Sequence, residues 1–101
     1  MKIVLTKNAK NNLTLILKYL ENNWSIFHRK KFVQKLDNML EIISEHPYLC
    51  VESKQFPGIR QCTLTKQISF YYKILNDSIV ILTITDNRKN PKSIKDQLID
   101  H

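Results

Sequence analysis

The chain has 101 residues, of which 43% are hydrophobic, and its 16 lysines and arginines outnumber nine acidic residues to give a formal net charge of +7. This length supports one domain with a single two-layer core, and the apolar fraction excludes a disordered chain. No stretch approaches the roughly 20 apolar residues of a membrane span, and the apolar start is too short for a signal peptide. We therefore expect one domain over residues 1–101, no membrane association and a cytoplasmic location.

The positive charge speeds encounter with nucleic acids and acidic proteins, but it does not determine the fold. The densest basic cluster is Arg29-Lys30-Lys31 with Lys35, which we interpret as the solvated side of a helix. Cys50 and Cys62 are expected to be reduced thiols in a cytoplasmic protein. No Cys-x-x-Cys pair, His-x-x-x-His pair or Gly-rich phosphate loop is present, so we predict no metal ion and no cofactor.

The first half of the chain predicts a strand at Lys2–Leu5 followed by a helix over residues 7–22. The hydroxyl of Thr6 can cap this helix, and Asn22-Asn23 is expected to end it, since asparagine tolerates the left-handed conformation. Apolar residues three or four positions apart define its core face: Ala9, Leu13, Ile16, Leu17 and Leu20.

A second helix is predicted over residues 26–45, with Ser25 as its cap and Pro47 just beyond its end. Trp24, in the connection, is interpreted as a core residue. The two helices are joined by a short connection and should form an antiparallel hairpin. The apolar stripe of the second helix consists of Phe32, Val33, Leu36, Met39, Leu40 and Ile43.

The second half of the chain predicts a loop over residues 48–58 and then three antiparallel strands. Segments rich in β-branched and aromatic residues form these strands, and Asn76-Asp77-Ser78 is typical of a hairpin turn. After Pro91, apolar residues form either a short helix that packs back on the domain or a tail that orders only with a partner. The predicted strands are Ile59–Thr65, Ile68–Leu75 and Ile79–Thr85.

Together these elements predict an α+β fold in which the helical hairpin packs on one face of an antiparallel sheet. The N-terminal strand should pair within that sheet, whose last three strands form a meander. Strand alternation places Tyr71 and Lys73 on the face opposite Phe70 and Tyr72. Because two helices cover only one face, we expect Tyr71 and Lys73 to lie on an open face.

The order of strand, helical hairpin and three-strand meander resembles that of the bacterial RelE/ParE toxin superfamily. The resemblance covers nearly the whole chain and depends on three short motifs in the meander. The motifs are Arg60 at the start of its first strand, Phe70-Tyr71-Tyr72-Lys73-Ile74 in its middle strand, and Ile79-Val80-Ile81-Leu82 followed by Asp86-Asn87-Arg88-Lys89-Asn90-Pro91.

The resemblance implies the toxin of a type II toxin–antitoxin pair, bound to a cognate antitoxin as a hetero-oligomer. RelE-like members cleave messenger RNA on the ribosome, and many carry an arginine three residues before the conserved tyrosine of the middle strand. That tyrosine corresponds to Tyr72 here, and the arginine position is Ser69. The resemblance therefore favours a ParE-like, non-enzymatic inhibitor of DNA gyrase. The alternatives are a ribosome-dependent mRNA endoribonuclease and a basic nucleic-acid-binding module without toxicity.

The candidate residues for target or partner binding are Arg60, Tyr71, Lys73, Arg88 and Lys89. If RNA is cut, Arg60 and Arg88 are expected to hold the phosphate, because a guanidinium binds two of its oxygens at once. Tyr71 is then the nearest proton-transfer candidate, although its pKa of about 10 makes it a poor base unless cations lower it. We expect the antitoxin to lie as a helical or extended segment across exposed apolar and basic surface, including the face with Tyr71 and Lys73.

Overall fold

The computed structural model describes residues 1–87 and 91–99, which contain four strands and three helices. None of these helices is long and apolar enough to cross a membrane. The elements are β1 (Lys2–Leu5), α1 (Lys7–Asn23), α2 (Ile26–Glu45), β2 (Arg60–Thr63), β3 (Ile68–Leu75), β4 (Ser78–Asp86) and α3 (Pro91–Ile99).

The four strands form one sheet in the order β1-β4-β3-β2. β2, β3 and β4 make the expected antiparallel meander, and β1 joins the same sheet. However, β1 pairs with β4 in the parallel direction, so the sheet is mixed and the expectation of an antiparallel sheet is wrong for this strand. Parallel pairing is possible because α1, α2 and the meander carry the chain back to the side of β1.

The turn between β3 and β4 confirms the predicted hairpin. Leu75 pairs with Ser78, and Asn76 has a positive φ of 55°, which asparagine tolerates better than most residues. β2 is shorter than predicted, because Thr65 already belongs to the turn into β3, where its hydroxyl accepts the backbone N–H groups of Gln67 and Ile68.

Both predicted helix caps are present. The Thr6 hydroxyl accepts the backbone N–H of Ala9, and the Ser25 hydroxyl accepts that of His28. The predicted left-handed end of the first helix is wrong. Asn23 is still helical, and its side-chain amide donates to the carbonyl of Tyr19 inside the last turn instead of favouring a left-handed backbone.

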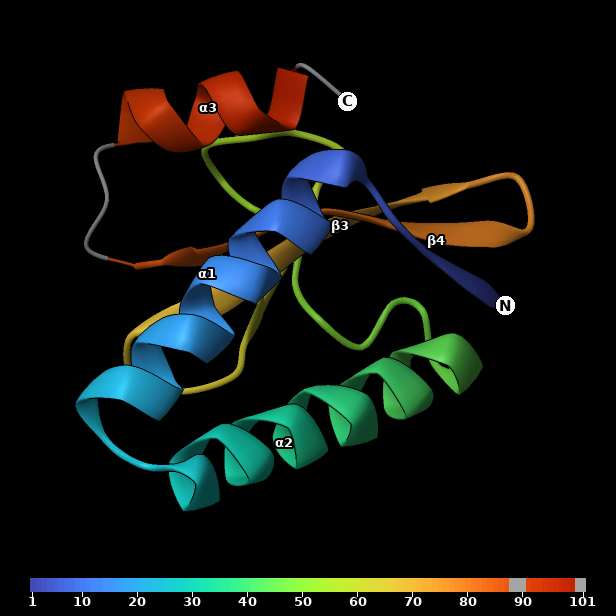
Figure 1. The fold of residues 1–101 in the computed structure, drawn as a ribbon. Helices are drawn as coiled ribbons and strands as arrows, with labels where there is room; N and C mark the ends of the chain where they lie inside the picture. Colours follow the sequence, from blue (N-terminus) through green and yellow to red (C-terminus); the bar gives the residue numbers. More distant parts are fainter. Residues whose placement is uncertain (88–90, 100–101) are drawn as a thin grey trace.

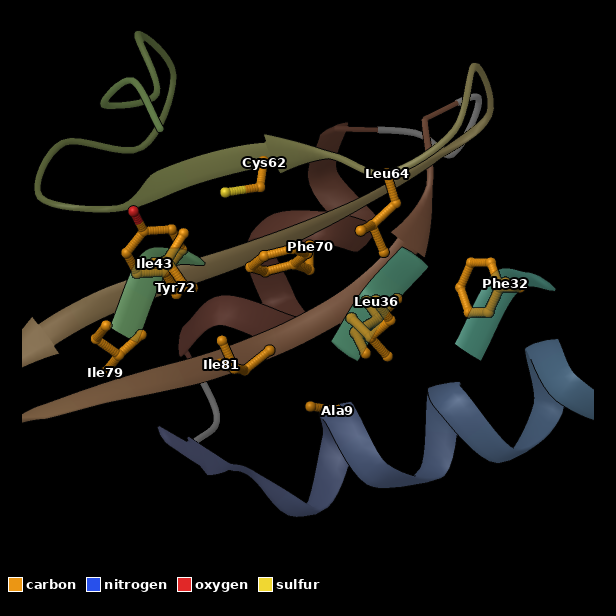
Figure 2. Close-up of a cluster of buried hydrophobic side chains, with 11 residues drawn as sticks. Ala9, Phe32, Leu36, Ile43, Cys62, Leu64, Phe70, Tyr72, Ile79 and Ile81 are labelled. Carbon is orange, nitrogen blue, oxygen red and sulfur yellow. The ribbon is translucent and has the colours of Figure 1, made fainter. Parts of the chain in front are cut away.

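The main core lies between the sheet and the pair α1 and α2. Figure 2 shows Phe70, Tyr72 and Ile81 pointing from the strands toward side chains of the two helices, such as Leu36 and Ala9. The apolar stripes of both helices therefore bury against the face that the sequence predicts. Val33 is an exception, because it lies on the outer side of α2 beside Arg29 and Lys30.

The opposite face of the sheet is covered by α3, which Figure 1 shows on the far side of the sheet from α2. Ile94 and Leu98 of α3 are buried against Tyr71 of β3 and Leu82 of β4. The expectation that this face is open around Tyr71 is therefore wrong, and of the two predicted states of the C-terminal segment the helix that packs back is the one observed. The apolar spacing of Ile94 and Leu98, one helical turn apart, explains why the segment can cover the sheet.

The two cysteines are bonded to each other as a disulfide, with 5.3 Å between their Cα atoms. This corrects the expectation of reduced thiols. The loop before β2 runs back along this strand, as the hydrogen bond from the Gln61 N–H to the Val51 carbonyl shows. This course brings Cys50 beside Cys62, which faces the core on β2.

Candidate functional site

Arg60 is held against the loop that precedes β2. One of its guanidinium nitrogens donates to the carbonyl of Cys50 at 2.7 Å and to that of Tyr48 at 3.4 Å. The guanidinium also lies over the Tyr48 ring, 4.9 Å from its centroid. The stacked pair exposes aromatic surface, because Tyr48 itself is mostly exposed. Arg60 and Tyr48 thus form a cationic and aromatic platform at the edge of the sheet.

Tyr71 is only 5% exposed. Its ring packs edge-on against Phe56, with 6.1 Å between centroids, and lies beneath Ile94 and Leu98 of α3. Burial raises the pKa of Tyr71 above its usual value of about 10. The phenol is therefore neutral at physiological pH and shielded from a large substrate.

The register of β2 and β3 separates Arg60 from Tyr71. Arg60 pairs directly with Tyr72, and Gln61 pairs with Tyr71. Directly paired residues share a face and neighbours along a strand alternate, so Arg60 lies on the face of the helical hairpin and Tyr71 on the face of α3. The two residues that the sequence suggests for phosphate binding and proton transfer are not brought together.

Of the other predicted site residues, the structure describes Lys73 but not Arg88 and Lys89. Lys73 lies on the same strand face as Tyr71 and is half-buried, opposite Val80 of β4. Arg88 and Lys89 lie outside the described residues, so their role stays a prediction.

Ser69 occupies the strand position at which an arginine is expected in RNA-cleaving relatives. It is fully buried, and its hydroxyl and that of Thr85, the residue paired with it on β4, have no hydrogen-bond partner among the described residues. A longer, charged side chain at this position has no room without displacing its surroundings. The described part of the sheet therefore offers no cation at this position.

An apolar groove that the sequence analysis missed lies beside the connection between α1 and α2. Its volume is about 620 Å³. Trp24, interpreted as core from the sequence, is 64% exposed and lines this groove. Leu15 and Tyr19, one turn apart on α1 and outside its core stripe, were the available signal in the sequence. The lining residues are Leu15, Ile16, Tyr19, Leu20, Trp24, His28, Lys31, Phe32, Lys35, Thr65, Gln67, Ile68 and Asp86.

Comparison with known proteins agrees with this architecture. In a search of solved structures, the chain is similar to the chromosomal ParDE toxin–antitoxin system from P. aeruginosa, with a TM-score of 0.73 and 20% identity over 85% of this chain and 95% of that one. It is also similar to a YoeB/ParE toxin from Agrobacterium tumefaciens, with a TM-score of 0.63 and 12% identity over 86% and 99% of the two chains. At these identities the likeness concerns the fold.

A third similar structure is a YoeB-YefM complex from Staphylococcus aureus, with a TM-score of 0.58 and 18% identity over 84% of this chain and 94% of that chain. A search of curated proteins finds no match. A family model described as the ParE toxin of the type II toxin–antitoxin system parDE matches residues 3–91. This match covers the sheet and the helical hairpin and confirms the resemblance to the RelE/ParE superfamily; the chain belongs to the ParE toxin family of type II toxin–antitoxin systems.

Proposed function

We propose that this toxin inhibits DNA gyrase by binding to it, without cutting RNA, and that a cognate antitoxin neutralises it. The family match supports a ParE-like target, and the positive charge favours encounter with a DNA-bound enzyme or with an acidic antitoxin. The site of action is then the cytoplasm, where gyrase acts on the chromosome.

The observation that carries this proposal is that Arg60 and Tyr71 lie on opposite faces of the sheet. Cutting RNA through its 2′-hydroxyl needs a base for the proton and cations for the charged phosphorane at the same phosphate. A Tyr71 phenol that is buried beneath α3 and has a raised pKa is not available as that base. Binding to a target protein does not require a base and a cation at the same point.

In this proposal the Arg60–Tyr48 platform supplies contacts to the target. The Arg60–Tyr48 platform offers a cation and an aromatic face at the sheet edge, and arginine and tyrosine are both enriched at the energetically dominant positions of protein interfaces. Lys73, Arg88 and Lys89 remain proposed contacts. Tyr71 acts in this scheme as a structural residue that anchors α3.

The test is to induce the chain alone in a bacterium and then with the product of the reading frame adjacent to its gene. Growth arrest that the second protein relieves identifies a toxin and its antitoxin. Loss of gyrase supercoiling activity with purified toxin, and no new RNA ends in the arrested cells, supports the gyrase target. Absence of any arrest would favour the non-toxic binding module.

Single-residue variants test which residues contribute to growth arrest. Arg88→Ala and Arg60→Ala are expected to reduce arrest, whereas Arg29→Ala removes the same charge from the exposed start of α2 and should leave arrest unchanged. Tyr71→Phe should also leave arrest unchanged. New RNA ends in cells with the parent toxin that disappear with Tyr71→Phe would overturn the gyrase proposal in favour of an endoribonuclease.

A further inference from the structure

The disulfide lies where an extended stretch of the loop before β2 runs antiparallel to that strand. Glu52 of the loop forms an isolated antiparallel bridge with Arg60 of β2. Two positions further along each segment in this register, Cys50 lies opposite Cys62, and their Cα atoms are 5.3 Å apart. Two cysteines at this separation can form a disulfide without movement of either backbone. The pair is therefore placed to pass between its thiol and disulfide forms while the sheet stays folded.

One of the two cysteines can be reached by a thiol in solution. Cys62 is 2% exposed and faces the core from β2 (Figure 2), whereas Cys50 is only partly buried. The neighbours of Cys50 in the loop, Leu49 and Val51, are both strongly exposed. Disulfides that solvent can reach are more easily reduced than fully buried ones. A reductant is therefore expected to attack the sulfur of Cys50, with Cys62 as the leaving group.

The cysteines lie next to the Arg60–Tyr48 platform on both segments. Tyr48 precedes Cys50 by two residues in the loop, and Arg60 precedes Cys62 by two residues in the strand. The Arg60 guanidinium donates to the Cys50 carbonyl at 2.7 Å and lies over the Tyr48 ring. The disulfide thus fixes the backbone that accepts from Arg60 and that carries Tyr48.

The loop has little apolar burial of its own to keep it in place. Tyr48, Leu49 and Val51 are each more than half exposed. The loop is also attached by hydrogen bonds, such as the one from the Tyr72 hydroxyl to the Pro47 carbonyl. A segment with few buried apolar contacts opens locally at a low cost in free energy. Without the covalent bond, the loop is expected to open much more often.

We propose that Cys50 and Cys62 form a thiol-exchange site that controls the Arg60–Tyr48 platform, with dithiol reductants and oxidised glutathione as its reactants. A thiolate of the dithiol attacks the Cys50 sulfur, the bond to Cys62 breaks, and Cys62 leaves as a thiolate that takes up a proton. The second thiol of the reductant then attacks the mixed disulfide, which frees Cys50 as a thiol and leaves the reductant as a disulfide. The chain gains two electrons and two protons, and the loop that carries Tyr48 is released.

The reverse reaction closes the loop again. Oxidised glutathione takes the two electrons from the thiol pair and leaves as two molecules of reduced glutathione. In a cytoplasm, reduced glutathione and thiol proteins keep such a pair reduced until oxidants accumulate. The effect on activity rests on the proposed function, in which the platform contacts the target: the oxidised toxin inhibits gyrase strongly and the reduced toxin inhibits it weakly.

The site itself is tested on the purified full chain, without any target. The chain is equilibrated with reduced and oxidised glutathione, its free thiols are alkylated, and mass spectrometry gives the oxidised fraction. We expect the two forms to interconvert in folded protein, as shown by an unchanged far-UV circular dichroism spectrum. We expect the NMR order parameters of backbone N–H groups in residues 48–52 to fall from about 0.85 to below about 0.6 on reduction, while those of β4 stay constant.

The control of the platform is tested by gyrase supercoiling assays with the two forms of the toxin. We expect the oxidised toxin to inhibit at a concentration lower by about tenfold or more, since the platform residues are of the types that dominate interface energies. Cys50→Ser removes the bond and leaves the platform residues in place. This variant should inhibit like the reduced parent and should not respond to dithiothreitol, which also controls for effects of the reductant on gyrase.

The outcomes separate this inference from the proposed function. If the bond is reduced only when the chain unfolds, or if the order of residues 48–52 is the same in both forms, the exchange site is wrong. If both forms inhibit gyrase equally, control of the platform is overturned and the proposed function stands. If neither form inhibits gyrase, the proposed function fails, and the trapping and NMR measurements still decide whether the cysteines control the loop.

Discussion

Two threonines of β4, Thr83 and Thr85, are both buried but differ in their hydrogen bonds. The Thr83 hydroxyl lies 2.6 Å from the side-chain oxygen of Gln97 on α3 and accepts from the Asn12 amide of α1 at 2.9 Å. The Thr85 hydroxyl has no partner in the described part of the chain. A buried hydroxyl is favourable only when it is bonded, so the same substitution should have opposite effects at the two positions.

We expect Thr83→Val to lower the free energy of unfolding by about 1–3 kcal/mol and Thr85→Val to leave it unchanged or raise it by up to about 1 kcal/mol. Valine preserves the shape of threonine, so each variant is the control for the other. Denaturant titration of both proteins gives the measurement. A loss of stability in Thr85→Val as large as that in Thr83→Val would contradict the conclusion that only the Thr83 hydroxyl of this pair is hydrogen-bonded.

Tyr71 and Tyr72 also make stability depend on pH. Burial raises the pKa of both phenols. For Tyr72, a hydrogen bond with the Cys50 backbone and the positive charge of Arg60 both lower the pKa and so offset part of this rise. Because the folded-state pKa lies above the unfolded value, the folded protein binds more protons at alkaline pH. The associated stability is complete below about pH 10 and is lost as the pH rises further.

Denaturant titrations between neutral pH and pH 11 should show this loss, and Tyr71→Phe should make it shallower. Tyr19→Phe is the control, because the Tyr19 ring is exposed. The Tyr72 hydroxyl donates to the Pro47 carbonyl at 2.7 Å, so Tyr72→Phe mixes a lost hydrogen bond with the pH effect and is less informative. If the free energy of unfolding falls equally steeply with pH in the parent and in Tyr71→Phe, the buried Tyr71 phenol is not the cause of the loss.

At the scale of elements, the attachment of α3 rests on a small contact. Ile94 and Leu98 supply its buried apolar side chains, and Gln97 bonds to Asn12 and Thr83. Ile94→Ala should therefore weaken docking by about 2–5 kcal/mol, the usual range for truncating a buried isoleucine. Lys95→Ala changes an exposed position of the same helix and should have little effect.

Hydrogen exchange of α3 and the covered strands measures this docking. We expect Ile94→Ala to accelerate exchange in α3 and to increase solvent access around Tyr71, while α1 and α2 stay protected because their core lies on the other face. Uniform loss of protection in all elements would mean instead that α3 and the hairpin core unfold as one unit.

The disulfide links the loop before β2 to the sheet. Its cysteines are 12 positions apart, and closing a loop of this size restricts the unfolded chain by an amount equivalent to about 3 kcal/mol. Reduction should lower the free energy of unfolding by up to that amount. Parallel denaturation with and without dithiothreitol measures the effect, and Cys50→Ser provides a control that should not respond to the reductant.

At the scale of the whole molecule, the net charge of +7 should govern how fast an acidic partner associates. Mutual attraction increases the association rate at low salt and is screened over about 8 Å at physiological ionic strength. Stopped-flow mixing of the toxin with the product of the adjacent reading frame should therefore show association slowing as salt increases, with a much weaker effect on dissociation. An association rate that does not change with salt would show that the net charge does not accelerate association with this partner.

The sequence alone determined the local elements of this protein. Strand β1, the start of each hairpin helix and the ends of β3 follow from signals within a few residues: apolar periodicity, the Thr6 and Ser25 caps, and the Asn76-Asp77 turn. The order of these elements also indicated the superfamily. The helix face of the sheet was predictable, because the apolar stripes of α1 and α2 needed a partner.

Only the tertiary structure decided which distant residues meet. The pairing of β1 with β4, the docking of α3 over Tyr71 and the bond between Cys50 and Cys62 each join segments whose contact no local pattern encodes. The candidate site in the structure differs from the one expected from the sequence for the same reason. The register of β2 against β3 places Arg60 and Tyr71 on opposite faces, and the end of the helical hairpin leaves Trp24 in an open groove. Strand register and helix docking are set by packing across the whole core, since a shift of one residue exchanges the two faces of a strand.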